Sequence, residues 1–221
     1  MKKRRIKRKI KILLIFVFIT SFIVLSIDLN NKNHMIEIEQ LDDYKYILVN
    51  KENRLSKNFK PSNLVEVKKC SQGKFYLEEE TAKAYQQMCL DSIKEELNFS
   101  INSAYRSYDE QKKLYKEYLK IYGKDYVDKY VAVAGYSEHQ TGLAIDLESL
   151  DYDFFKYSKE YLWVKENAHN YGFIIRYQEG KEDITGYSAE EWHIRYVGKK
   201  VAKYIYENNI AFEEYYNLFL K

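Results

Sequence analysis

Two histidines and two carboxylates are the residues of this 221-residue chain whose types and spacing could do chemistry. Asp146 follows His139 by seven residues and interrupts the otherwise apolar segment 143–147. Further along, Glu190 precedes His193 by three residues. Two histidines and one carboxylate are the ligands of many catalytic zinc sites, which leave a fourth position open for water. A glutamate beside that water can act as a general base. The pattern is therefore compatible with a hydrolytic metal site.

The same residues also admit a purely structural interpretation. An unpaired carboxylate inside an apolar strand costs several kcal/mol, so Asp146 needs a positive partner. A buried arginine would serve as well as a metal ion, and His139 and His193 would then be core residues with satisfied hydrogen bonds. The residue pattern alone leaves both interpretations open. The other two histidines, His34 and His169, are expected at surface or helix-end positions.

The segments around these residues predict a mixture of helices and strands. Strands are expected at 44–50, 99–105, 143–147, 173–177 and 191–196, and helices at 78–97, 107–122, 125–134, 158–170 and the C-terminus. These elements do not alternate in the regular rhythm of a doubly wound sheet. We therefore expect an α+β domain with a small antiparallel sheet and flanking helices.

Local signals bear on the positions of the chemical residues. Ser107 and Glu110 form a capping box, so a helix should begin directly after Arg106. The helix N-terminus and the guanidinium would both favour an anion there, although a structural salt bridge is the simpler interpretation of Arg106 alone. Gly142 lies between the first histidine and the aspartate. It permits the bend they need, because residues seven apart in a straight strand face opposite sides.

The N-terminus resembles a membrane signal. Residues 1–11 hold eight cations and no acid, and residues 12–27 carry no charge. This is the arrangement of a secretory signal. Sixteen helical residues span roughly 24 Å, somewhat short of the bilayer core. No small-residue cleavage site follows, so we expect an uncleaved signal anchor, with a cleaved signal as the alternative. The predicted organisation is a basic head and anchor (1–28), a stalk (29–43) and one domain (44–221) outside the cytoplasm.

The charge of the rest of the chain argues against nucleic-acid binding. The whole chain has 36 basic and 33 acidic residues, but without its first eleven residues it has 28 basic and 33 acidic ones. Nucleic-acid binding requires a net basic face. The sequence also contains no glycine-rich phosphate loop and no G-x-S-x-G motif.

Two cysteines, Cys70 and Cys89, would lie in an oxidising compartment if the domain is exported. Cys89 shares a predicted helix face with Tyr85 and Ile93, which favours a buried thiol. A Cys70–Cys89 disulfide is the other possibility. Neither cysteine has a neighbouring histidine that would indicate a nucleophile or a metal ligand.

Three motifs resemble those of the zinc D-alanyl-D-alanine carboxypeptidases of the vancomycin-resistance type. The segment Ser137–Asp146 fits their S-x-H-x-x-G-x-A-x-D signature, Glu190–His193 fits E-x-W-H, and Tyr105–Ser107 fits a Y-R-S turn. The resemblance covers roughly residues 44–205, with the motifs in the expected order. The superfamily also includes the hedgehog signalling domain and lysostaphin-like endopeptidases, so the resemblance implies their hedgehog/DD-peptidase-like fold.

The resemblance implies one Zn²⁺ per chain, held by His139, Asp146 and His193. It implies that Glu190 is the general base, which takes a proton from the attacking water and hands it to the leaving amine. The family usually has proline where Glu191 stands here. Regular alternation would put Glu191, not Glu190, on the face of His193, so we expect the chain to bend at Glu190–Glu191 without proline, and Glu191 to point to solvent.

Three further residues receive roles from the same resemblance. Arg106 would stabilise the oxyanion of the tetrahedral intermediate or bind the terminal carboxylate of the substrate. Ser137 would form a hydrogen bond with the substrate, and Gln111 would line the pocket.

The expected function is removal of the C-terminal D-alanine from peptidoglycan stem peptides by a monomeric zinc carboxypeptidase. An L,D-carboxypeptidase acting on the tetrapeptide is the first alternative. A peptidoglycan endopeptidase and a non-catalytic wall-binding relative are weaker ones. The expected partners are the stem peptide and the membrane, with no nucleic acid. The expected location is the cell membrane with the domain outside, or the medium if the signal is cleaved.

Overall fold

The computed structural model describes residues 44–221. The predicted head, anchor and stalk, residues 1–43, lie outside the described residues. Among residues 44–221, no helix combines the length and the apolar character needed to cross a membrane.

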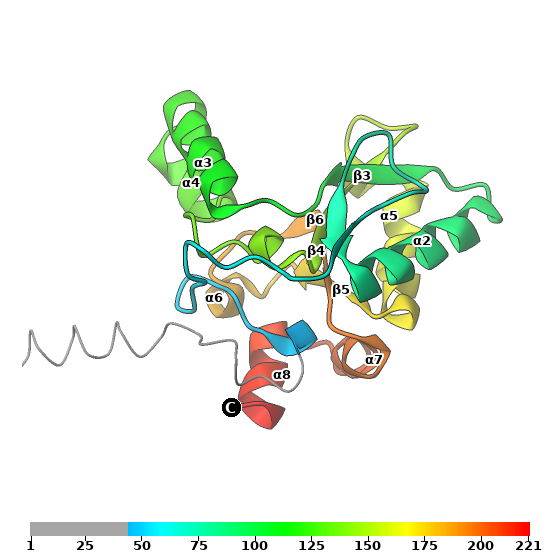
Figure 1. The fold of residues 1–221 in the computed structure, drawn as a ribbon. Helices are drawn as coiled ribbons and strands as arrows, with labels where there is room; N and C mark the ends of the chain where they lie inside the picture. Colours follow the sequence, from blue (N-terminus) through cyan, green and yellow to red (C-terminus); the bar gives the residue numbers. More distant parts are fainter. Residues whose placement is uncertain (1–43) are drawn as a thin grey trace, which may run out of the picture. The chain divides into compact units, whose positions relative to one another are not determined.

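A four-stranded antiparallel sheet forms the centre of the described domain (Figure 1). Its strands lie in the order β3 (Phe99–Ser103), β4 (Ala144–Ser149), β6 (Glu190–Tyr196) and β5 (Phe173–Tyr177). The two inner strands, β4 and β6, carry the predicted aspartate and second histidine. The prediction of an α+β domain with a small antiparallel sheet is therefore confirmed.

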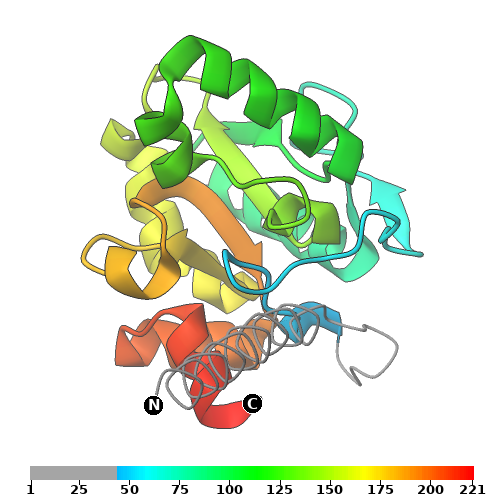
Figure 2. The same ribbon diagram turned by 90° about the vertical axis from the view of Figure 1, so that its left-hand side faces the viewer.

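Helices cover both sides of this sheet (Figures 1 and 2). On one side lie α2 (Glu79–Ile93) and α5 (Lys159–Asn167), and on the other lie α3 (Tyr108–Tyr122) and α4 (Lys124–Tyr130). The ring of Phe99 on β3 contacts Tyr85 of α2 and Trp163 of α5, with ring centroids 6.4 and 6.3 Å apart. The helices α7 (Lys199–Asn208) and α8 (Phe212–Phe219) follow β6. The smaller elements are η2 (Tyr44–Tyr46), β1 (Leu64–Glu66), β2 (Tyr76–Glu78), η3 (Glu138–Thr141), η4 (Phe155–Tyr157), η5 (Ala168–Tyr171) and α6 (Glu182–Thr185).

Most predicted elements are present, with shifted ends. The bounds of β5 are as predicted, and Ser107 caps α3 through the expected capping box. Helix α2 ends at Ile93, which is 52% exposed, so the predicted buried face does not extend that far. Helix α4 ends at Tyr130 rather than near residue 134. The antiparallel pair β1–β2 was not predicted, because its strands have only three residues each.

The predicted strand at 44–50 is wrong. This segment contains η2 and then an irregular stretch in which Ile47, Leu48 and Val49 are buried. The backbone carbonyls of Lys45 and Ile47 accept hydrogen bonds from Nη2 of Arg195, at 3.1 and 2.8 Å. The buried guanidinium of Arg195 thus provides the hydrogen bonds that a neighbouring strand would otherwise have to provide. The apolar side chains of this segment pack into the core although its backbone is not part of the sheet.

The two cysteines form a disulfide bond, Cys70–Cys89, which joins the loop after β1 to α2. Of the two possibilities left open by the sequence, the buried free thiol is therefore excluded.

Candidate active site

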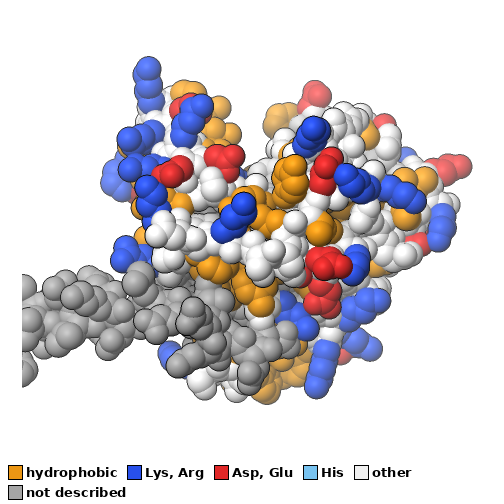
Figure 3. Space-filling view, viewed as in Figure 1, with side chains coloured by type: hydrophobic (Ala, Val, Ile, Leu, Met, Phe, Trp, Pro, Cys, Tyr) orange, Lys and Arg blue, Asp and Glu red, His pale blue; other side chains and the backbone are white. Residues whose placement is uncertain are grey.

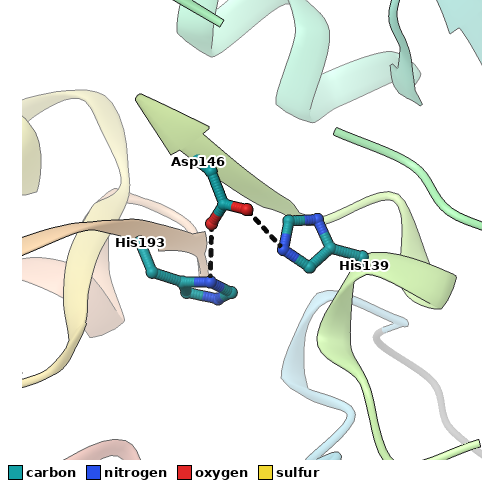
Figure 4. Close-up of side chains that lie close together, drawn as sticks. All are labelled: His139, Asp146 and His193. Atoms are coloured by element: carbon teal, nitrogen blue, oxygen red, sulfur yellow. Dashed lines mark hydrogen bonds and ion pairs between the residues drawn. The ribbon is translucent and has the colours of Figure 1, made fainter. Parts of the chain in front are cut away.

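His139, Asp146 and His193 converge from three different elements (Figure 4). Nε2 of His139 lies 3.2 Å from Oδ2 of Asp146, and Nδ1 of His193 lies 3.0 Å from Oδ1 of the same carboxylate. One ligand atom from each residue can be chosen so that all three lie within 4.8 Å of one another. The structure thus brings together the three residues that the sequence singled out.

The backbone explains this convergence. Asp146 on β4 pairs directly with His193 on β6, and directly opposed residues of an antiparallel pair share one face of the sheet. His139 reaches the same point from η3, which ends at Gly142 in the left-handed conformation with φ +70°. A Cβ at this glycine would lie 2.9 Å from Cδ2 of Leu64 and 3.0 Å from the backbone nitrogen of Glu78. The predicted bend at Gly142 is confirmed, and no larger residue fits there without displacing its neighbours.

A hydrogen bond between His139 and the backbone determines which of its two ring nitrogens carries the proton. Nδ1 of His139 lies 2.7 Å from the carbonyl oxygen of Ala104, which can only accept, so Nδ1 carries the proton. Burial lowers the pKa of His139, and the two histidines hold the pKa of Asp146 well below its usual range despite its burial. A neutral Nε2 and an ionised carboxylate are both acceptors. A cation bound by both would satisfy them, which is the arrangement expected of a metal site.

His193 is held by a second carboxylate, which the sequence analysis missed. Nε2 of His193 lies 3.4 Å from Oε2 of Glu138. The other oxygen of Glu138 accepts hydrogen bonds from Arg176 and Arg195, at 2.8 and 2.9 Å. Burial would raise the pKa of Glu138, but the two arginines hold it well below its ordinary value. This carboxylate is therefore ionised and orients the ring so that Nδ1 points at Asp146.

The electrostatics around His193 favour a positive species at its Nδ1. Burial lowers the pKa of this histidine, but its hydrogen bonds to Asp146 and Glu138 outweigh burial and raise the pKa to about 9. Carboxylates thus face both ring nitrogens. Either a proton or a metal ion at Nδ1 meets that requirement, and the donor set of two imidazoles and one carboxylate fits Zn²⁺.

The ionic cluster continues away from the site. Arg176 donates two hydrogen bonds to Glu213, at 2.8 and 2.5 Å, and Asn50 donates to the same carboxylate at 3.2 Å. Arg176 and Arg195 are fully buried. The sequence does contain a sign of this cluster, since each of the apolar predicted strands 173–177 and 191–196 includes an arginine. A buried charge must be paired, so both arginines need an acidic partner. Nothing in the sequence indicated that Glu138 would be their partner.

Glu190 points into the site because the strand is irregular. Ile175 of β5 pairs with Ile194 of β6, whereas Tyr177 pairs with Glu190, so β6 has extra residues between these two points. One carboxylate oxygen of Glu190 lies 3.8 Å from Nδ1 of His193. Burial raises the pKa of Glu190 to about 8. The predicted bend without proline is therefore confirmed.

The neighbouring Glu191 does not point to solvent, contrary to the prediction. Its carboxylate lies 2.6 Å from Nζ of Lys156, and its side chain is only 11% exposed. Glu191 thus lies beside Lys156 and does not line the cleft that holds Glu190.

Arg106 lies immediately before the cap of α3 and faces the candidate metal ligands. It donates hydrogen bonds to Gln111 and Ser103, at 2.9 and 3.0 Å, and its Nη2 is 3.8 Å from Oδ2 of Asp146. Gln111 is buried and donates in turn to the carbonyl of Ala132 at 2.6 Å. Gln111 therefore positions the guanidinium as well as lining the pocket.

These residues lie in a cleft of about 450 Å³ between the α3–α4 pair and the sheet. Figure 3 shows the surface hollowed between the α3–α4 pair and the part of the domain that carries β3. The cleft is lined by the three candidate ligands, Glu190, Arg106, Gln111, Ser137, Trp192 and five tyrosines, among other residues. Ser137 is buried, and its hydroxyl forms no hydrogen bond with any residue in 44–221. It is therefore available to a bound molecule.

Comparison with known families agrees with the sequence motifs. The VanY family model, described as D-alanyl-D-alanine carboxypeptidase, matches residues 74–199. The Bacillus subtilis (strain 168) protein YodJ is 42% identical over 179 residues, which make up 76% of this chain and 66% of YodJ. The chain thus spans just under two thirds of the length of this curated relative.

Two solved structures share the fold. The LD-carboxypeptidase LdcB is 41% identical with a TM-score of 0.71, and the match covers 77% of this chain and 84% of LdcB. A mutant of the vancomycin-resistance D,D-pentapeptidase VanY, solved in complex with Zn(II), is 29% identical with a TM-score of 0.69. That match covers 78% of this chain and 99% of VanY. The predicted resemblance to the vancomycin-resistance carboxypeptidases is therefore confirmed.

The role of Glu138 can be tested with two substitutions. Glu138→Gln should lower the affinity for Zn²⁺ about 10- to 100-fold, because His193 loses the carboxylate that orients it. Glu213→Gln is the matched control, since Glu213 pairs with Arg176 but does not contact His193. Both variants should unfold at lower denaturant concentration, because each weakens a buried ionic cluster. Equal Zn²⁺ affinities in the two variants, measured by calorimetric titration, would contradict this role.

Proposed function

We propose that this chain, which belongs to the VanY family of D-alanyl-D-alanine carboxypeptidases, removes the C-terminal D-alanine from peptidoglycan stem peptides. The observation that carries the proposal is the convergence of His139, Asp146 and His193 in a cleft that also holds Glu190 and Arg106. Candidates for a metal-ligand set and a base thus lie beside a cation in one place, and these are the parts that hydrolysis of a peptide bond requires.

His139, Asp146 and His193 would hold one Zn²⁺. The facing acceptor atoms of His139 and Asp146 support this assignment, and the related VanY was solved with Zn(II). When bound, the ion would polarise the scissile carbonyl and acidify water. The protein contributes the orientation of the ligands, through Ala104 behind one histidine and Glu138 behind the other.

Glu190 would act as the general base and then as the general acid. Its carboxylate is close to His193 and almost fully buried. Burial raises its pKa to about 8, which suits a group that must hold a proton and hand it to the leaving amine at neutral pH. A cation at the neighbouring ligands would lower this pKa, because it favours the ionised carboxylate that accepts the first proton.

Arg106 and Ser137 would bind the substrate. The guanidinium has five N–H donors, and two of its hydrogen bonds go to Gln111 and Ser103. The remaining donors are available for the oxyanion of the tetrahedral intermediate or the terminal carboxylate. Ser137 would add a hydroxyl from the floor of the cleft.

An L,D-carboxypeptidase that trims the tetrapeptide is the second candidate function. One observation favours it: the chain is 41% identical to the LD-carboxypeptidase LdcB and 29% identical to the D,D-pentapeptidase VanY. Both activities would use the same six site residues, and the difference would lie in how the cleft accommodates the residue before the scissile bond.

The purified protein should release D-alanine from a stem pentapeptide that ends in D-Ala-D-Ala. Mass spectrometry of the products distinguishes the two functions, because the L,D activity would instead shorten the tetrapeptide. A metal chelator should abolish turnover in either case, and Zn²⁺ should restore it. A preparation that is active yet free of metal by elemental analysis would exclude the proposed metal site.

Glu190→Gln should lower kcat by about 10²–10⁴-fold, because the general base is lost, while the Zn²⁺ content stays at that of the wild type. Glu191→Gln is the matched control, since Glu191 pairs with Lys156 on the other side of the strand. This variant should retain most of its activity. The opposite pattern would show that Glu191 is the base.

We further propose that residues 12–27 anchor the chain in the cell membrane, with the domain outside. The proposal rests on the eight cations that precede this uncharged segment. Protease added to intact protoplasts should then remove the domain. If the domain faced the cytoplasm, the protease would reach it only after the protoplasts are lysed. Complete protection in intact protoplasts, together with cleavage after lysis, would contradict this topology.

A further inference from the structure

One face of α3 forms a continuous stripe that begins at the active site. Gln111, Leu114, Tyr118 and Tyr122 follow one another at intervals of three, four and four residues, which places them on one side of the helix. The first three line the cleft, and Gln111 also holds Arg106. From Gln111 to Tyr122 the stripe is roughly 16 Å long, at 1.5 Å per residue. It therefore leads from the catalytic arginine to the far end of the helix.

Tyrosines from α4 extend this stripe into a row of four rings, which we call the tyrosine row: Tyr118, Tyr122, Tyr126 and Tyr130. The ring centroids of successive members lie 5.4, 4.7 and 5.0 Å apart. Three of them, Tyr118, Tyr126 and Tyr130, line the catalytic cleft. The row and the cleft are thus one continuous surface.

The tyrosine row is too exposed to be only the core of the α3–α4 pair. Tyr122, Tyr126 and Tyr130 are 55%, 38% and 37% exposed. Every residue of α3 and α4 is described by the structure, and only Gln111 and Val127 are buried there. In Figure 3 the lysines and arginines of this pair gather on the side that faces away from the hollow. An exposed aromatic surface that continues a catalytic cleft is a typical ligand-binding surface.

We propose that the tyrosine row binds the glycan to which the stem peptide is attached, an inference that rests on the proposed function. Phenol rings offer flat apolar faces to the C–H face of a sugar ring, and their hydroxyls form hydrogen bonds with sugar hydroxyl and acetamido groups. The row consists of four uncharged side chains, which suits an uncharged amino sugar. The enzyme would therefore prefer a stem peptide carried on its disaccharide to the free peptide.

The length of the substrate agrees with this placement. The sugar is joined to the stem peptide about four residues before the scissile bond, or roughly 13 Å of extended chain. Tyr118 and Tyr122 lie roughly 10 and 16 Å along α3 from Gln111, the residue that positions Arg106. A peptide whose reacting end lies at Arg106 and which follows α3 would thus bring its sugar to these two rings.

A second aromatic surface borders the cleft on the opposite side and provides a rival. A cavity of about 730 Å³ shares Asn102 and Trp192 with the cleft and is lined by Phe154 and Tyr157, which are 71% and 77% exposed. This cavity also contains four charged side chains, Glu148, Asp153, Lys156 and Glu191. Its charges fit an uncharged sugar less well than the tyrosine row does.

The test compares kcat/KM for a disaccharide-linked stem peptide and for the same peptide without sugar. The wild type should prefer the linked substrate by about tenfold, which corresponds to about 1.4 kcal/mol of additional binding by the sugar. Tyr122→Ser should reduce this preference to nearly one while kcat/KM for the free peptide stays unchanged, because Tyr122 lies at the end of α3 and does not line the cleft. Tyr122→Phe, which keeps the ring, should retain most of the preference.

Tyr157→Ser is the matched control on the rival surface and should retain the wild-type preference. Three results would overturn the proposal: equal kcat/KM for the two substrates in the wild type, an unchanged preference in Tyr122→Ser, or a lost preference in Tyr157→Ser instead. Inactivity of the wild type on both substrates would contradict the proposed function and not the subsite. In that case the subsite is tested by calorimetric titration with the disaccharide linked to the shortened product peptide. Tyr122→Ser should weaken the binding of this ligand, and Tyr157→Ser should not.

Discussion

A carboxylate shared by two buried arginines and a histidine is the interaction on which the rest of this domain depends. Glu138 is 1% exposed, and Arg176 and Arg195 are fully buried. Leaving any one of these charges without its partner inside the protein would cost about 3–5 kcal/mol, a large fraction of the stability of a typical domain. The cluster therefore connects η3, β5 and β6, and no single member of it can be lost without a large penalty. Through Arg195 it also fixes the irregular segment that contains Ile47.

The same cluster couples the fold to the chemistry. One oxygen of Glu138 neutralises the arginines, and the other faces His193. Because the arginines hold the pKa of Glu138 well below its usual range, the carboxylate stays ionised when the site gains or loses protons. The orientation of His193 therefore depends on this buried cluster at one ring nitrogen and on Asp146 at the other.

The sequence predicted the parts of this structure that depend on local pattern. The three metal-ligand candidates, the capping box at Ser107 and the bend at Gly142 follow from residue type and spacing, and the structure has all of them. What the sequence could not predict depends on partners far apart in the chain. Glu138 lies 38 residues from Arg176 and 57 from Arg195, and no periodicity encodes such a pairing. The strand predicted at 44–50 is wrong for the same reason. Its apolar residues indicate burial, but they do not show whether a neighbouring strand or a distant guanidinium forms hydrogen bonds with its backbone.

The placement of Glu190 shows how a bend can be kept without the residue that usually makes it. Strand alternation would put Glu191 beside His193, and the irregular pairing of β6 with β5 reverses this order. Glu191 is then held by Lys156, whose side chain is half exposed, and an ion pair of that kind contributes little stability by itself. The larger constraint is the register: the irregular pairing leaves Glu190 buried in the cleft, where burial raises its pKa to about 8, whereas a regular strand would move Glu191 there and displace it from Lys156. The irregular pairing thus gives two adjacent carboxylates different environments, and it is Glu190 that lies beside His193.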